Sequence, residues 1–142
     1  QLEYPSLEEE IQVVKNTTDD RKTEISTLFS AEEILEIQHL MRRIPVPDNV
    51  VRYAVELAQK TRPGQAGASE LVNQYLDWGA GPRASQNLVL AAKAHAAVDG
   101  RFSPDIADVK AVAPGILRHR ILRNYKAEVE GISDEVIIDK LL

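Results

Sequence analysis

Apolar residues recur along much of this chain at the three- and four-residue spacing of an α-helix. The clearest run contains Ile34, Ile37 and Met41, which would share one helix face. Ser30 precedes this run, and Glu33 follows Ser30 by three residues, a pattern typical of a helix start with a capping box. The segment is therefore predicted to be an amphipathic helix that begins after Ser30.

Similar patterns predict further helices and an all-α fold, a small bundle of five to six helices. Asp48 or Asn49 is expected to cap the third helix, and Pro114 with Gly115 is expected to end the fifth. The helix from Pro82 to Asp99 is rich in alanine, so we expect it to lie centrally, against the helices from Ala31 and Asn49. The predicted helices cover approximately residues 6–17, 31–44, 49–61, 82–99, 104–113 and 133–141.

The remaining segments give weaker signals. Residues 16–24 are polar throughout and indicate an exposed loop, while residues 25–29 are compatible with an extended segment. Residues 70–79 and 120–130 do not indicate one type of element. No alternating strand pair, Asn-Gly hairpin or internal repeat appears in the sequence.

Composition excludes several classes of site. The 142 residues contain no cysteine, which rules out disulfides and thiolate chemistry and fits a reducing compartment such as the cytoplasm. No apolar run approaches the length of a membrane span, and the first ten residues are acidic where a signal peptide is basic. We therefore expect neither membrane association nor export.

Charge is unevenly distributed around the net value of −5. Residues 1–40 carry ten acids and three bases, residues 41–126 carry seven acids and thirteen bases, and residues 127–142 carry five acids and one base. The basic middle could consist of solvated helix faces whose charges cancel in space, or it could contain an anion site.

Motifs for independent catalysis are missing. None of the seven glycines is followed by lysine, so the sequence has no P-loop. Asp134 and Glu135 resemble the acidic pair of such ATPases, but Gly-Ile-Ser precedes them instead of an apolar strand, which favours a helix start. His39, His95 and His119 show no metal-ligand spacing and no triad pattern, so each is interpreted as structural.

Arg83 lies in an unusual place, in the first turn of the alanine-rich helix after Gly-Ala-Gly-Pro. A cation there opposes the helix dipole unless an anion or an acid faces it. Arg83 could therefore contact a phosphate, or it could fold back onto a surface carboxylate. Spacing alone does not distinguish these two possibilities.

The run Gly-Ala-Gly-Pro-Arg-Ala-Ser at residues 79–85 resembles the C-terminal lid of MoxR-type AAA+ ATPases. Further runs agree with that family in order and spacing: Tyr-Pro-Ser at residues 4–6, Ser-Ala-Glu-Glu-Ile-Leu at 30–35, Arg-Arg-Ile-Pro-Val at 42–46, Ser-Pro-Asp-Ile-Ala-Asp-Val-Lys at 103–110 and Leu-Arg-His-Arg at 117–120. The resemblance covers essentially the whole chain. One departure is Gly81, where the family often has serine, although glycine is also an acceptable cap.

The resemblance implies that Arg83 is the sensor-2 arginine, which reaches the γ-phosphate of ATP held by a preceding core. Pro82, Ala84 and Tyr4 are the other nucleotide-binding residues that it implies. Residues 1–4 would be the strand tail that ends this core, and residues 5–142 would be the lid. With the P-loop and magnesium-binding acids in the core, the lid would bind neither ATP nor Mg²⁺ alone and would not hydrolyse ATP.

The family also implies partners and a role that the residues themselves do not show. These are homo-oligomeric rings, contacts with neighbouring subunits and chaperone-like maturation of other proteins, often beside von Willebrand factor A domain proteins. Neither nucleic acid nor a membrane is an expected partner. The Leu-Arg-His-Arg run at residues 117–120 matches the family, but a subunit contact and helix capping explain Arg118, His119 and Arg120 equally well.

Two other classes of function remain open at this stage. The basic middle could track nucleic-acid phosphates, with the helix after Ser103 in a groove, although residues 104–114 offer only Lys110 as a contacting side chain. The chain could also be an interaction domain without a ligand.

Overall fold

The computed structural model describes residues 4–20 and 25–142, which fall into two compact units, residues 1–33 and 34–142. The predicted strand tail at residues 1–4 lies outside the described residues except for Tyr4, which has no regular secondary structure. Residues 21–24 of the predicted loop are likewise outside the described part.

The first unit contains one complete helix, α1 (Leu7–Thr17). The Ser6 hydroxyl accepts a hydrogen bond from the Glu9 amide, and the Glu9 carboxylate accepts one from the Ser6 amide, so a capping box starts α1. A second capping box joins Ser30 and Glu33 at the start of α2 (Ala31–Arg43), as predicted. Residues 25–30 form neither helix nor strand.

The second unit holds most of the chain, and its helices confirm the all-α class. About 63% of the structure is helical, and the described residues form eight helices and one two-stranded sheet. The second unit comprises the rest of α2 and the following elements: α3 (Asp48–Lys60), α4 (Glu70–Tyr75), β1 (Leu76–Trp78), α5 (Pro82–Val98), α6 (Ile106–Leu117), β2 (Leu122–Arg123), α7 (Tyr125–Val129) and α8 (Asp134–Leu141).

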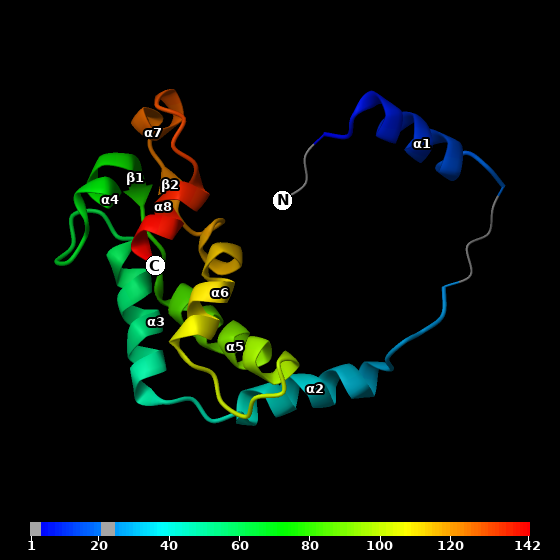
Figure 1. Cartoon of the computed structure of the whole chain (residues 1–142), viewed down its shortest axis with the longest axis horizontal. Helices are drawn as coiled ribbons and strands as arrows, with labels where there is room; N and C mark the ends of the chain where they lie inside the picture. The colour runs from blue at the N-terminus through cyan, green and yellow to red at the C-terminus, as the bar shows by residue number, and fades with distance from the viewer. Residues whose placement is uncertain (1–3, 21–24) are drawn as a thin grey trace. The chain divides into compact units, whose positions relative to one another are not determined.

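Helix α5 is the centre of this unit and packs along α3 and α6 (Figure 1). Ala84, Leu88, Ala92 and Ala96 recur every four residues and are all completely buried. Because alanine is small, such a stripe lets neighbouring helices approach closely. The central position agrees with the prediction, although α6, and not α2, is the second main neighbour.

Helix α2 meets α5 at its last turn. The Nζ atom of Lys93, a largely buried residue, donates a hydrogen bond to the carbonyl oxygen of Arg42 at 3.1 Å. A cation at that place satisfies a carbonyl that has no partner within its own helix. Lys93 therefore fastens the end of α2 to the central helix.

Two predicted helix boundaries were wrong. Helix α3 starts one residue early, with Pro47 at the cap and no side-chain cap bond in the described structure, so Asp48 lies in its first turn. Helix α6 continues through Pro114 to Leu117. Val109, Ala113 and Leu117 are completely buried along one face of α6, and this packing outweighs the hydrogen bond that proline removes.

A small sheet joins the two segments that the sequence left open. Strand β1 pairs antiparallel with β2, with Leu76 opposite Arg123 and Trp78 opposite Leu122. This pair was not predicted, because strands of three and two residues are too short to show alternation and lie far apart in the chain. Across the described part of the chain, no helix is both long and apolar enough to cross a bilayer.

Candidate functional site

Arg83 is the second residue of α5, directly after Pro82 at the first helical position. Gly81 is the N-cap residue, with an extended backbone, and among the described residues no side chain caps this end of the helix. The amino end of a helix carries partial positive charge and unpaired amides. The start of α5 is therefore suited to an anion, and Arg83 adds a full positive charge to it.

The Arg83 side chain is exposed. It forms no ion pair or hydrogen bond with any residue in the ranges 4–20 and 25–142. A fold-back onto a surface carboxylate, the alternative explanation from the sequence, is thus not seen. The guanidinium remains accessible to a ligand or partner.

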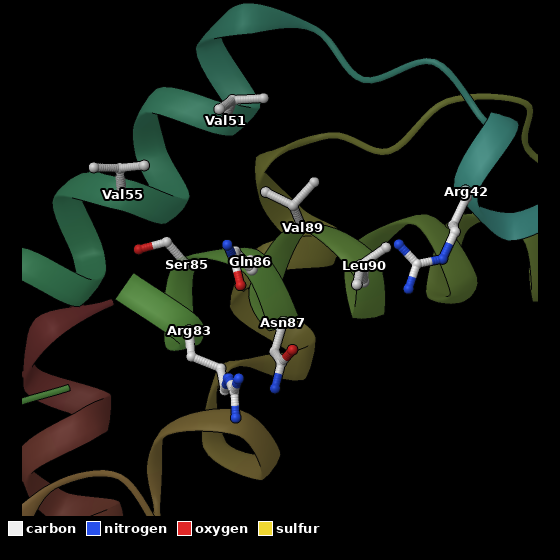
Figure 2. A pocket seen from close by; sticks show the side chains of 9 residues that line it. All are labelled: Arg42, Val51, Val55, Arg83, Ser85, Gln86, Asn87, Val89 and Leu90. Carbon is white, nitrogen blue, oxygen red and sulfur yellow. The ribbon is translucent and has the colours of Figure 1, made fainter. Parts of the chain in front are cut away.

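A groove of about 590 Å³ runs along α5 from Arg83 and is bordered by residues of α3 and α2 (Figure 2). Arg83 and Asn87, one turn apart, leave the same side of the helix, and Arg42 of α2 lies toward the other end beside Leu90. The residues that line the groove are Arg42, Val51, Val55, Arg83, Ser85, Gln86, Asn87, Val89 and Leu90. They include two arginines and no acid, with the side-chain amides of Gln86 and Asn87 available as further donors.

The other residues expected at a nucleotide site are placed differently. Pro82 is exposed beside Arg83, whereas the Ala84 side chain is completely buried and its amide donates to the carbonyl of Gly81 at 2.9 Å. Ala84 thus packs the core and presents no free group to a ligand. Tyr4 is exposed within the first unit, and its role in nucleotide binding stays a prediction.

Comparison with known proteins identifies the family. The profile of the AAA lid domain matches residues 68–141, which include β1, β2 and the helices from α4 to α8. The chain belongs to the AAA lid domain family. The match includes the whole of α5, with Arg83 in its first turn.

Individual relatives indicate the type of ATPase. The lid domain is 34% identical to the Chaperone MoxR1 of Mycobacterium tuberculosis, over 98% of this chain and 37% of that protein. It is 29% identical to the YeaC protein of Bacillus subtilis, over 98% of this chain and 41% of YeaC. A crystal structure from Cytophaga hutchinsonii, described as an ATPase, superposes with a TM-score of 0.79 at 33% identity and covers 99% of this chain and 43% of that one.

These matches make the chain the lid domain of a MoxR-like AAA+ ATPase, as its sequence motifs suggested. The chain spans about two fifths of the length of the relatives that it matches.

A second cluster of charged residues lies at the opposite end of α5. Asp108, only 1% exposed, accepts hydrogen bonds from both terminal nitrogens of Arg101 and from the Asp105 amide, and its Oδ1 lies 2.7 Å from His95 Nδ1. The Arg101 guanidinium holds the pKa of the Asp108 carboxyl well below its usual range. The hydrogen bonds from the Asp105 amide and His95 also lower this pKa, whereas burial of the carboxyl raises it.

The same cluster has the geometry of a cation site but not its chemistry. His95, Asp99 and Asp108 each offer one ligand atom, and these three atoms lie within 4.8 Å of one another. However, Arg101 contacts both oxygens of Asp108 and one oxygen of Asp99, so its positive charge stands where a cation would bind. The arrangement ties α5 to α6 in the lid domain, and the sequence reasoning missed it because these residues converge only in the fold.

Asp134 and Glu135 occupy the first turn of α8, in agreement with their interpretation as part of a helix start. The Arg118 Nε lies 2.6 Å from a Glu135 oxygen, and the Arg123 Nε lies 3.1 Å from an Asp134 oxygen. These pairs connect α8 to the segment that follows α6. Negative charge at the amino end of a helix is favourable in addition.

Arg120 shows how the Leu-Arg-His-Arg run is used within the lid domain. Its Nη1 donates to the carbonyl oxygen of Ile116 in the last turn of α6 at 2.6 Å, and it also contacts the ring of His119. This is the helix-capping alternative for Arg120. A subunit contact by the exposed His119 stays a prediction.

Proposed function

We propose that Arg83 is the sensor-2 arginine of a MoxR-like ATPase, which contacts the γ-phosphate of ATP held by a core domain outside this chain. The observation that carries the proposal is an exposed guanidinium at a helix amino end, for which residues 4–20 and 25–142 provide neither a side-chain partner nor a side-chain cap. Both features favour an anion at the same place. Membership of the AAA lid domain family supports nucleotide as the source of that anion.

The chain's own residues have a limited set of tasks in this proposal. Arg83 donates hydrogen bonds to phosphate oxygens, and its charge stabilises negative charge that develops during phosphoryl transfer. The buried stripe of α5 holds the helix rigidly against α3 and α6, so that movement of Arg83 moves the lid. Without the γ-phosphate, Arg83 would lose its partner and the lid would be free to rotate, which would couple nucleotide state to motion.

Magnesium has no suitable ligands near Arg83 in the described structure. The groove beside it is lined by arginines, amides, one serine and apolar side chains, and Arg101 pairs with both carboxylates of the His95, Asp99 and Asp108 cluster at the far end of α5. We therefore assign the magnesium-binding acids to the core. When bound there, Mg²⁺ and ATP supply charge neutralisation and the transferable phosphoryl group.

The wider assignments concern the complete protein. We propose that it forms a homo-oligomeric ring and acts as a chaperone on other proteins; the name Chaperone MoxR1, borne by a relative that matches over 98% of this chain, supports the chaperone part of this proposal. Association with von Willebrand factor A domain proteins belongs to the same proposal. A cytoplasmic location is consistent with the absence of cysteine from the sequence.

The nucleic-acid alternative is weaker on structural grounds. Helix α6, which would have to enter a groove, packs against α3, α5 and α8. Its exposed positions are Ala107, Lys110, Ala111 and Gly115, which offer one basic side chain and no amide. A recognition helix needs several polar side chains on its free face.

Steady-state ATP hydrolysis by the full-length protein tests the proposal. We expect Arg83→Ala to lower kcat by roughly a hundredfold, since removal of one preorganised donor to a transition state has effects of this order. Arg83→Lys keeps the charge but loses the planar fork and should be impaired to a lesser extent. Arg52→Ala is the matched control, because Arg52 is an exposed arginine on α3 that does not line the groove.

A kcat for Arg83→Ala equal to that of Arg52→Ala would rule out the sensor role. In that case the lid would act as an interaction domain. Binding of a fluorescent ATP analogue, measured in parallel, separates loss of nucleotide affinity from loss of catalysis.

A further inference from the structure

The residues at the end of α3 hold the loop that leads into α5. Thr61, which is completely buried, donates its hydroxyl to the carbonyl of Ala58 at 2.7 Å and accepts the Ala80 amide at 2.8 Å. The next residue, Arg62, donates its Nε to the carbonyl oxygen of Ala80 at 2.9 Å. The amide and the carbonyl of Ala80 are thus both hydrogen-bonded by two consecutive residues that directly follow α3.

Gly79 lies so close to the backbone of Thr61 and Arg62 that no side chain fits at position 79. A Cβ atom built on Gly79 would lie 2.3 Å from the carbonyl oxygen of Thr61 and 2.5 Å from the Cα of Arg62. The loop therefore lies with its backbone directly against the backbone of Thr61 and Arg62. Ala80, completely buried, adds an apolar anchor.

We propose that Thr61 and Arg62 are positioning residues for Arg83, an inference that rests on the proposed function. Arg83 follows Ala80 by three residues and has no side-chain partner among the described residues. Its direction is consequently set by the backbone at the start of α5. Gly81 contributes no cap there, so the bonds from Thr61 and Arg62 fix that backbone. Catalytic groups need such support because small displacements are costly.

The experiment measures ATP hydrolysis by the full-length protein carrying Thr61→Val, which keeps the shape of the side chain and removes the hydroxyl. We expect kcat to fall about tenfold with a smaller change in KM, since a displaced Arg83 loses mainly transition-state contacts. Thr61→Ser restores the hydroxyl and should restore kcat. Hydrogen exchange should show faster exchange of the Ala80 amide in Thr61→Val.

A double-mutant cycle separates positioning from other effects. If Thr61 acts through Arg83, Thr61→Val should change kcat by less than about twofold when Arg83 is already alanine, because coupled residues give non-additive effects. Equal effects of Thr61→Val in both backgrounds would overturn the inference.

General destabilisation is controlled with Ile138→Val, which removes one methyl group from a completely buried residue in α8. This variant should lower the melting temperature and leave kcat unchanged. If Thr61→Val fails to fold, Arg62→Met takes its place in the same cycle, since it keeps the apolar stem and removes the guanidinium whose Nε donates to Ala80.

The outcomes distinguish this inference from the function on which it rests. Loss of activity in Arg83→Ala, with normal activity in Thr61→Val and Arg62→Met, would refute positioning and leave the sensor role intact. Normal activity in Arg83→Ala would refute both. Loss in all three, with non-additivity in the cycle, supports both.

Discussion

Arg101 and Asp108 form a two-pronged ion pair in which the arginine is partly exposed and the carboxylate is buried. Arg101 lies just after α5 and Asp108 lies in the first turn of α6, where its side chain also completes a capping box with Asp105. His95 approaches the same carboxylate from α5. One side chain thereby starts α6 and joins it to the central helix.

Asp108→Asn should destabilise this chain at neutral pH by about 2 kcal/mol, because Arg101 loses its charged partner and a buried acceptor is replaced by a donor. Chemical denaturation at pH 7 measures the change. Asp99→Asn is the control, since the Asp99 side chain is 52% exposed and should contribute less than about 0.5 kcal/mol.

The same pair predicts a pH dependence with a definite sign. Because the folded-state pKa of Asp108 lies below its ordinary value of 3.8, the folded state binds fewer protons on this group than the unfolded state does. Its stabilising contribution is therefore complete above that value and is lost as the pH falls through and below it. The stability difference between the wild type and Asp108→Asn should shrink on acidification, and a constant difference down to acid pH would contradict this account.

Gly79→Ala should destabilise the lid domain by about 2 kcal/mol or more, because the new Cβ would meet the backbone of Thr61 at 2.3 Å. Gly81→Ser is the matched control two residues away, where nothing lies within 4 Å of the added Cβ. Serine there can cap α5, so stability should rise by a few tenths of a kcal/mol. Thermal unfolding of both variants measures this contrast, and similar melting temperatures would refute the proposed close approach.

Lys93→Met should loosen the end of α2 without unfolding the core. The substitution keeps the apolar stem of the side chain and removes the donor to the Arg42 carbonyl. Hydrogen exchange is expected to become faster in the last turn of α2, with little change in α5. Unchanged exchange in α2 would show that its end is held by other contacts.

Arg83→Ala should leave the stability of this chain unchanged or raise it by about 0.5 kcal/mol or less, although we expect the same substitution to lower the kcat of the complete protein by roughly a hundredfold. The reason is that Arg83 opposes the helix dipole and has no ion-pair partner in the described structure. Chemical denaturation of the chain measures the effect. A clear loss of stability would indicate a structural partner for Arg83 and weaken the proposed role.

Much of the helical architecture was predictable because its signals are local. The capping boxes at Ser6 and Ser30, the proline at the start of α5 and the serine before α8 depend on residues within one turn of each other. The same locality singled out Arg83, since a cation in the first helical turn is visible without any knowledge of the fold.

Contacts between distant segments of the chain could not be predicted from the sequence and became visible only in the tertiary structure. The β1–β2 pair, the Arg101–Asp108–His95 cluster and the bonds from Thr61 and Arg62 to Ala80 join residues whose spacing carries no helical or strand pattern. Pro114 shows the converse, since a strong local stop signal yields to burial of the surrounding face.

Local chemistry in the sequence thus predicted most of the longer helices and singled out Arg83 as a cation in the first turn of a helix. Only the packing of α3 against α5 decided how that arginine is held, because hydrogen bonds and excluded volume act between atoms that the chain brings together in space.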